Sequence, residues 1–180
     1  MRNFLIFVSS LILLSACGSK TLVNQPKSAD LSIFEHALKD TLGLIRGADL
    51  GEEYEVVEQL EYDSALVVKS KFNLVYDYNL GEDNSINVKY IFAGTSVRLI
   101  ELNLLLTSEI MADSVATDFI NYYSKRFGTP AQQMGVYVWK TETMLPNSDA
   151  YIELKDESAE YGFGKLNITI FPRPSKKSEA

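Results

Sequence analysis

The sequence predicts an α+β fold, a two-layer sandwich in which two helices pack on one face of a curved antiparallel sheet of about six or seven strands. Apolar residues alternate with polar ones along several short segments, and two longer segments carry an apolar stripe at helical spacing. All connections between these segments are short, so neighbouring strands should be antiparallel. We therefore expect one domain at residues 31–172, followed by a polar tail at 173–180.

The first helix is expected over residues 32–46. Ser32 and Glu35 have the spacing of a capping box, in which each side chain bonds to a free amide of the first turn. Gly47 suits the left-handed residue that follows a helix, and Gly43 weakens the last turn by about 1 kcal/mol, which allows an earlier end. The apolar face of this helix consists of Phe34, Leu38, Leu42 and Ile45.

The strands of the first half follow this helix. Residues 49–63 fit either a strand or a helix, because their apolar residues satisfy both spacings. Residues 72–78 and 86–92 alternate clearly and are joined by a turn-forming segment at 79–84, so we expect a hairpin. A further strand is expected at 97–106.

The second half repeats the order of helix and strands. A helix is predicted over residues 109–127, with Ser108 to cap its start and Gly128 to end it. Three strands are expected, at 136–141, 151–155 and 165–171. Both halves read as a helix, a glycine and then strands. This order is compatible with duplication of one unit, although the residues themselves do not repeat.

The composition of the chain argues against a nucleic-acid partner and against a disulfide in the domain. The chain of 180 residues is 46% hydrophobic, which is enough for a core, and its formal net charge at pH 7 is −7. An acidic chain is a poor binder of nucleic acid through bulk charge, so we expect no nucleic-acid partner. The chain has one cysteine, so we expect no disulfide within the domain, which must be stable through packing alone.

The first seventeen residues indicate the destination of the chain. A basic start precedes an apolar run at residues 4–14, which as a helix is about 16 Å long. That length is too short to span a bilayer and is typical of a signal-peptide core. The following Leu14-Ser15-Ala16-Cys17 resembles the lipobox of bacterial lipoproteins. The resemblance implies that the signal peptide, residues 1–16, is removed and that Cys17 becomes the lipidated first residue.

The same resemblance implies an address at the membrane. Enterobacterial-type lipoproteins that stay in the inner membrane have an aspartate after the cysteine, and this chain has Gly18, so we expect the outer membrane. No acidic cluster of the kind that directs surface display in other Gram-negative groups follows, so we expect the periplasmic face. Residues 17–30 are predicted to be the lipidated Cys17 and a flexible tether with a span of roughly 20 Å. Two or three acyl chains hold a protein on a membrane, whereas one binds only marginally.

The residue types that usually carry catalysis or bind metals are few. His36 and Asp40 are one helical turn apart, as in part of a Ser-His-Asp set, but no serine lies in a nucleophile-elbow sequence. One histidine and an acylated cysteine leave no ligand set for zinc or copper. The segment Asp77–Asp83 resembles a calcium loop only in part, because Gly81 occupies a ligand position. We expect no metal and no cofactor.

Two sets of side chains are candidates for a functional surface. An acidic set can face a basic partner, act as general acid and base, or line a solvated face; it comprises Glu52, Glu53, Glu55, Glu58 and Glu61. In the second set, Tyr137 and Trp139 share one face of a strand, and Tyr151 on a neighbouring strand can join them. If that face points away from the helices, the three form a platform for a peptide, a glycan or another protein. Otherwise they belong to the core.

Two classes of function follow from these observations. The first is a membrane-anchored, non-catalytic periplasmic binding lipoprotein, an envelope assembly or inhibitor-like factor whose partner is another envelope protein. The alternative is a carboxylate-dependent hydrolase that acts on cell-envelope material. A buried carboxylate pair in a cleft favours the hydrolase, and an exposed aromatic sheet face favours the binding protein.

Overall fold

The computed structural model describes residues 31–146 and 148–174, within a compact unit that begins at Leu31. The predicted signal peptide, Cys17 and tether, and the last residues of the predicted tail, lie outside the described residues. The helices are α1 (Ile33–Leu38), α2 (Tyr54–Leu60), α3 (Glu109–Phe127) and α4 (Ser158–Tyr161). The strands are β1 (Leu66–Lys69), β2 (Asn73–Gly81), β3 (Asn84–Ala93), β4 (Ser96–Leu106), β5 (Ala131–Gln133), β6 (Val136–Glu142), β7 (Ser148–Asp156) and β8 (Gly164–Pro174).

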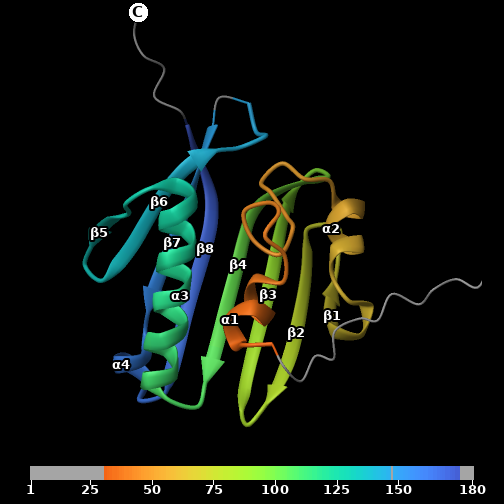
Figure 1. The fold of residues 1–180 in the computed structure, drawn as a ribbon. Helices are drawn as coiled ribbons and strands as arrows, with labels where there is room; N and C mark the ends of the chain where they lie inside the picture. The colour runs from red at the N-terminus through yellow and green to blue at the C-terminus, as the bar shows by residue number, and fades with distance from the viewer. Residues whose placement is uncertain (1–30, 147, 175–180) are drawn as a thin grey trace, which may run out of the picture. The chain divides into compact units, whose positions relative to one another are not determined.

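The strands form a single antiparallel sheet in the order β1-β2-β3-β4-β8-β7-β6-β5. This order places two four-stranded units side by side, joined by the antiparallel pairing of β4 with β8. α1 precedes the first unit and α3 precedes the second, so the two halves share one topology (Figure 1). The tertiary structure thus contains a repeated helix-and-sheet unit, whereas the residues alone left duplication open.

The longest helix confirms its prediction. α3 spans Glu109–Phe127 and lies in front of β7 and β8 in Figure 1. The hydroxyl of Ser108 accepts a hydrogen bond of 3.2 Å from the amide of Met111, which caps the start. Gly128 ends the helix with a φ of 85°, a conformation that favours glycine. The buried residues of α3 are Ala112, Val115, Ala116, Phe119 and Tyr123.

The first helix is shorter than predicted. The capping box of Ser32 and Glu35 is present, but α1 ends at Leu38. At Lys39 the backbone turns with a φ of 58° and a ψ of −48°, and the amide of Asp40 donates to the carbonyl of Leu38 at 2.6 Å. This is a γ-turn of the rare, strained kind, and it stops the helix. The prediction that the helix continues to residue 46 was wrong.

A compact loop replaces the rest of that helix. Gly43 and Gly47 have φ values of 65° and 84°, which a right-handed helix does not contain. Leu42, predicted on the core-facing side, is 70% exposed. The loop still supplies core residues, but not at helical spacing; they are Leu44, Ile45, Ala48 and Leu50.

The number of elements also differs from the prediction. The fold is α+β with an antiparallel sheet, but the described residues contain eight strands and four helices in place of about six or seven and two. The ambiguous segment 49–63 contains the short helix α2, which buries Val57. The additional strands β1 and β5 lie at the two edges and have four and three residues, too few for alternation to be recognised. Strand β8 continues to Pro174, past the predicted domain end at 172.

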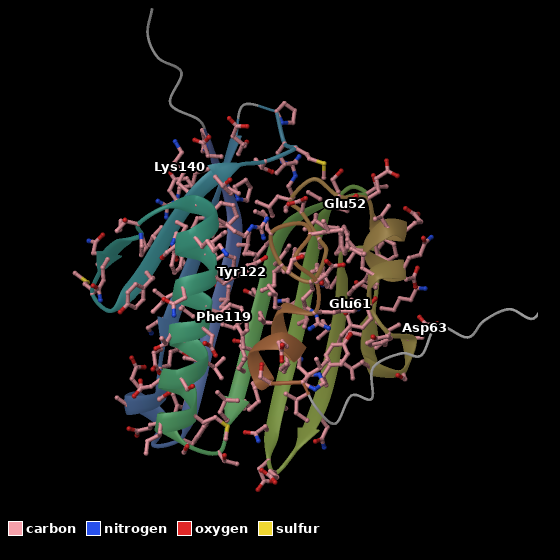
Figure 2. The ribbon with its side chains drawn as sticks, viewed as in Figure 1. Glu52, Glu61, Asp63, Phe119, Tyr122 and Lys140 are labelled. Carbon is pink, nitrogen blue, oxygen red and sulfur yellow. The ribbon has the colours of Figure 1, made fainter. Side chains whose placement is uncertain are left out.

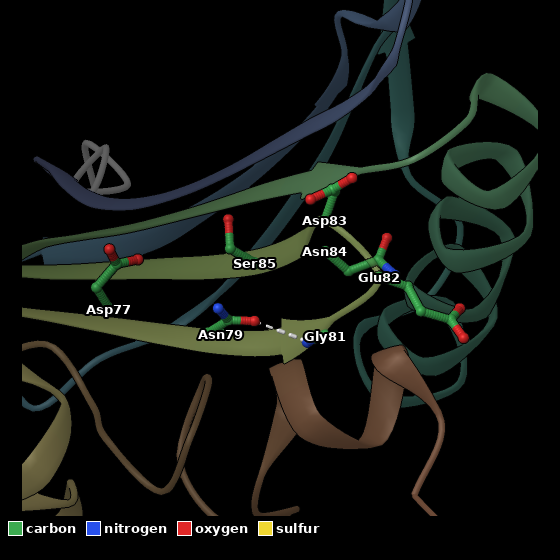
Figure 3. Close-up of a pocket in the computed structure, with 7 residues that line it drawn as sticks. All are labelled: Asp77, Asn79, Gly81, Glu82, Asp83, Asn84 and Ser85. Atoms are coloured by element: carbon green, nitrogen blue, oxygen red, sulfur yellow. Dashed lines mark hydrogen bonds between the residues drawn. The ribbon is translucent and has the colours of Figure 1, made fainter.

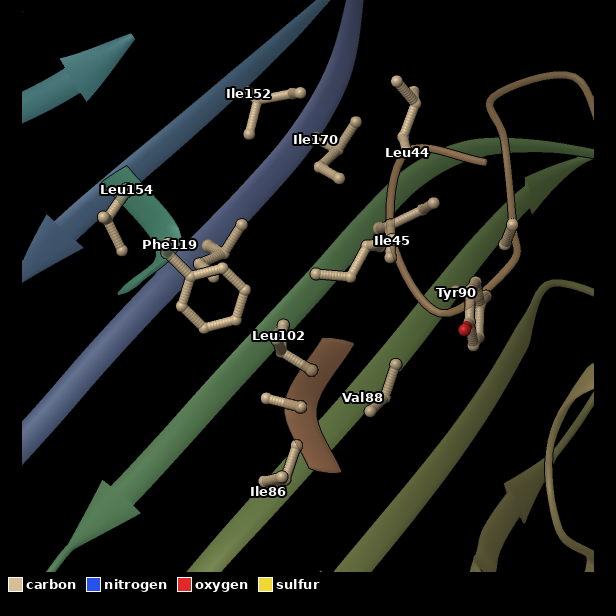
Figure 4. Packing of buried hydrophobic residues seen from close by; sticks show 14 of the residues in the cluster. Leu44, Ile45, Ile86, Val88, Tyr90, Leu102, Phe119, Ile152, Leu154 and Ile170 are labelled. Atoms are coloured by element: carbon tan, nitrogen blue, oxygen red, sulfur yellow. The ribbon is translucent and has the colours of Figure 1, made fainter. Parts of the chain in front are cut away.

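The core lies between the sheet and the layer of helices and loops. Phe119 of α3 packs among the inward side chains of the sheet, as Figure 4 shows. Burying a side chain of this kind contributes about 1.5–3 kcal/mol relative to leaving it exposed. The inward residues of the four central strands include Ile86, Val88, Tyr90, Phe92, Val97, Ile100, Leu102, Leu104, Leu106, Ala150, Ile152, Leu154, Leu166, Ile168 and Ile170. Among the described residues, no helix is long and apolar enough to cross a membrane.

Candidate functional site

Within the described part of the chain, one face of the sheet has no buried residue. Along each strand, the residues that alternate with the core residues are half-buried or exposed. We call this surface the open face. On the four central strands it consists of Ser85, Asn87, Lys89, Ile91, Leu99, Glu101, Asn103, Leu105, Asp149, Tyr151, Glu153, Lys155, Lys165, Asn167, Thr169 and Phe171.

An apolar stripe crosses the open face. It consists of Val68, Val75, Ile91, Leu99, Phe171 and Tyr151, taken from β1, β2, β3, β4, β8 and β7 in their order across the sheet. The register places Val68 opposite Val75. It also places Ile91 opposite Leu99. Tyr151 lies opposite Phe171. Members of neighbouring pairs are adjacent or diagonal, which is within side-chain reach on one sheet face.

The aromatic end of the stripe is covered by a cation. The rings of Tyr151 and Phe171 stack with centroids 6.1 Å apart and an interplanar angle of 24°. The guanidinium of Arg173 lies 4.7 Å from the Tyr151 centroid and 4.9 Å from the Phe171 centroid. An arginine over an aromatic face at this range is attracted by the ring quadrupole. The two rings are therefore half-buried and held in a defined orientation.

The charged side chains near the stripe are paired within the chain. Lys89 bonds to Glu101 at 3.0 Å on the neighbouring strand. Arg173 lies 3.4 Å from Glu153, and Lys140 lies 2.8 Å from Asp149. Exposed pairs of this kind contribute about 0–1 kcal/mol to stability. Their effect on recognition is larger, because they leave the surface around the stripe close to neutral.

A band of neutral polar groups lies beside the stripe. Asn87, Asn103 and Asn167 occupy neighbouring positions on β3, β4 and β8. The amide of Asn167 donates to the side-chain oxygen of Asn103 at 2.8 Å, and the Thr169 hydroxyl donates to Asn167 at the same distance. The open face thus combines an apolar stripe with amide and hydroxyl groups. Each of these features is typical of a contact surface between proteins.

The three aromatic residues predicted to form a platform do not lie together. Trp139 pairs with Ile152, faces the helices and is 1% exposed, and its ring lies 5.4 Å from that of Tyr123 in α3. Tyr137 stacks on Trp139 and packs against the core. Tyr151 is on the open face. The platform of Tyr137, Trp139 and Tyr151 is therefore corrected: the first two belong to the core side, and only Tyr151 contributes to an uncovered surface.

The most strongly buried charges surround Glu61. This carboxylate lies between the ends of α1 and α2, beneath the loop that follows α1 (Figure 2). Arg46 donates to both of its oxygens, at 2.6 and 2.8 Å. The hydroxyls of Tyr78 and Tyr90 donate at 2.7 and 2.6 Å, and Lys39 donates at 2.9 Å. Five hydrogen bonds thus fix a single carboxylate, and we call this set the Glu61 cluster.

The Glu61 cluster holds its carboxylate ionised. Burial opposes the charged form, but the bonds and charge of Arg46, together with Lys39, lower the pKa of Glu61 to about 2. Burial lowers the pKa of Lys39 by more than Glu61 raises it. For Arg46, burial is the largest single cause and lowers the pKa, but the hydrogen bonds to Glu61 and the charge of Glu61 together raise it above its ordinary value. Arg46 is therefore the principal partner, and Glu61 is too weak a base at neutral pH for proton transfer.

Two of the other candidates, Glu58 and Asp40, have local partners. Glu58 pairs with Lys69 on the surface. Asp40 lies beyond the end of α1, where its carboxylate accepts a hydrogen bond from the Leu42 amide, so it is not on one helix face with His36. The predicted relation of His36 and Asp40 depended on the longer helix and is corrected with it.

The hairpin loop between β2 and β3 forms a shallow acidic hollow at the edge of the molecule (Figure 3). Asn79 accepts a hydrogen bond of 2.8 Å from the Gly81 amide, which makes it part of the turn. Glu82 and Asp83 adopt φ values of 50° and 59°. No group of three or more His, Cys, Asp or Glu side chains suited to a metal ion occurs among the described residues.

Comparisons with protein-family models, curated proteins and solved structures find no match. The open face therefore has to be interpreted from its own chemistry. Sequence reasoning identified Tyr151 but missed the rest of the apolar stripe, because most of these residues stand at positions that looked like the solvent side of their strands. The available signal was the presence of Val75, Ile91 and Phe171 at those positions.

Proposed function

We propose that the chain is a lipid-anchored, non-catalytic binding protein on the periplasmic side of a bacterial outer membrane, and that its open face is the contact surface. The observation that carries this proposal is the apolar stripe on an uncovered sheet face. Exposed contiguous apolar surface in a soluble domain marks an interaction site. Its partner is a protein of the cell envelope, and the acidic character of the chain makes nucleic acid an unsuitable one.

The Glu61 cluster supports a binding role over a carboxylate-dependent hydrolase. A hydrolase of that kind needs a carboxylate that can exchange a proton near the working pH. Glu61 is the buried glutamate of the acidic set, and its pKa of about 2 and its five donors suit it to holding the loop after α1 on the sheet. We assign this cluster to stability.

Contact by the open face is tested with a photo-reactive phenylalanine analogue at Tyr151 in the anchored chain, irradiated in native envelopes. The matched control carries the same analogue at Tyr62, an aromatic residue that is 56% exposed and lies outside the open face. We expect a discrete covalent adduct from position 151 and none from position 62. Absence of any adduct at 151, or equal adducts at both positions, contradicts a contact role for the open face.

Anchoring is tested separately with Cys17→Ser. The resemblance to the lipobox implies that this change removes both the acyl mass and the membrane association of the chain. Mass spectrometry and membrane fractionation measure these two properties. A variant that remains in the membrane fraction contradicts lipidation at Cys17.

A further inference from the structure

We propose that the apolar stripe binds the stripe of a second copy of this chain, so that two open faces pack together around a twofold axis. The inference rests on the proposal that the open face is a contact surface, and it names the occupant. Three properties of the face support a second copy: the size gradient along the stripe, the local neutrality and the available area.

The stripe has small side chains at one end and large ones at the other. The small residues Val68 and Val75 lie on β1 and β2. The aromatic residues Phe171 and Tyr151 lie on β8 and β7. A twofold axis between Ile91 and Leu99 lays the aromatic end of one copy on the aliphatic end of the other. Large side chains then meet small ones, which is how facing layers interdigitate. Because the stripe runs across the strands, superposing two stripes gives the aligned packing of two sheets.

The pairing of charges near the stripe favours contact between two copies at this face. The chain carries a net charge of −7, so two copies repel each other through most of their surfaces. Around the stripe, Lys89 is paired with Glu101 and Arg173 with Glu153. Two open faces can therefore approach without a like-charge penalty, and the Asn103 and Asn167 amides can bond across a twofold interface as donors and acceptors.

The face is large enough for a stable pair. The six strands β2, β3, β4, β8, β7 and β6 are spaced about 4.8 Å apart and have at least four outward residues each, at about 6.8 Å, so they cover roughly 29 by 27 Å, or about 780 Å². This is close to the area of about 800 Å² per partner in a standard protein–protein interface. The proposed anchor confines the copies to one membrane surface, which raises their effective concentration.

The experiment is chemical cross-linking of the full chain in its native membrane. The sequence has one cysteine, Cys17, which the proposed acyl group blocks, so an introduced thiol is unique. In the proposed pair, the two Leu99 positions lie about 11 Å apart, from the 4.8 Å strand spacing and the 10 Å sheet separation. Leu99→Cys should therefore form a covalent dimer with a bifunctional thiol reagent of that reach. Asn121→Cys, on the exposed side of α3, and the parent chain should remain monomeric.

A disrupting variant tests whether the cross-linked dimer arises from random collision in the membrane. Phe171→Ala in the Leu99→Cys chain should weaken self-association roughly tenfold or more, since aromatic anchors dominate interfaces. Circular dichroism and urea unfolding establish that the variant is folded, and Val75→Lys at the opposite end provides a second test of the same contact.

The outcomes separate this inference from the proposed function. A product of twice the chain mass that is lost with Phe171→Ala supports the pair. A cross-linked product with a different protein overturns the second copy as occupant and leaves the contact role of the open face intact. Monomer only, with no adduct from the photo-reactive residue at position 151, overturns both.

Discussion

Trp139 and Tyr151 lie on adjacent paired strands and face opposite sides of the sheet. Trp139 is opposite Ile152 and packs beneath α3, whereas Tyr151 is opposite Lys140 on the open face. Because the two rings belong to consecutive residue pairs in the register, they point to opposite faces of the sheet. One ring therefore stabilises the fold, and the other is available to a partner.

This relationship predicts different costs for the two rings. Trp139→Ala should lower the free energy of unfolding by about 3–5 kcal/mol, because it opens a cavity in the core. Tyr151→Ala should cost about 1 kcal/mol, because its ring is half-buried and its surroundings can relax. Urea denaturation of both variants measures the difference, and equal losses would show that the strand faces are assigned incorrectly.

The Glu61 cluster predicts sensitivity to removal of one partner. Glu61→Gln leaves Arg46 buried without its counter-charge and should cost about 3–5 kcal/mol at pH 7. The matched control is Glu58→Gln, which removes a surface pair with Lys69 and should cost less than about 1 kcal/mol. A Glu61→Gln protein as stable as the control in urea would contradict the structural role of the cluster.

The same carboxylate predicts a loss of stability in acid. The folded pKa of Glu61, about 2, lies below the ordinary value of 4.5, so folding favours the ionised form. The stabilisation is complete above about pH 4.5 and is lost as the pH falls through about 2, a change of about 3 kcal/mol. Unfolding measured from pH 6 to pH 2 should show this decline in the parent chain. The decline should be smaller by that amount in Glu61→Gln, and parallel pH profiles would contradict the assignment.

Phe119 of α3 and Leu42 of the loop after α1 give a paired test of the corrected fold. Phe119→Ala should cost about 3–5 kcal/mol, because the ring is fully buried under the sheet. Leu42→Ala should change stability by less than about 0.5 kcal/mol, because Leu42 is 70% exposed in the loop after α1. A large loss at Leu42, measured by thermal unfolding, would restore the longer helix.

Gly164 predicts a steric limit where β8 meets the start of α3. A Cβ at this position would lie 2.4 Å from the Ser108 carbonyl oxygen and 2.8 Å from the Leu106 Cβ. Gly164→Ala should therefore cost about 1–3 kcal/mol through displacement of the backbone. Gly162→Ala is the control: Gly162 has a φ of 74° but open space around it, so only a conformational cost of about 1 kcal/mol is expected. A Gly164→Ala protein that unfolds at the parent's temperature would contradict this close approach.

The elements whose signals are local can be predicted from the amino-acid sequence. Ser108, the apolar spacing to Phe127 and Gly128 specify α3, and strict alternation specifies the central strands β2, β3, β4, β7 and β8. These signals depend on neighbouring residues of one segment, because capping, helical spacing and alternation act within a few residues. The resemblance of Leu14-Ser15-Ala16-Cys17 to a lipobox is equally local, and the prediction drawn from it depends on no fold.

The features that depend on distant residues become visible only in the folded chain. α1 ends at Leu38, and the side chain of the following Lys39 bonds to Glu61. No local pattern in the sequence indicates this partner beyond α2. The strand order decides which face the helices cover, and therefore that Trp139 is core and Tyr151 is open. The apolar stripe exists because six strands from both halves are aligned in register. Alternation assigns the residues of a strand to two faces but does not show which face is buried. Packing against the other elements determines that.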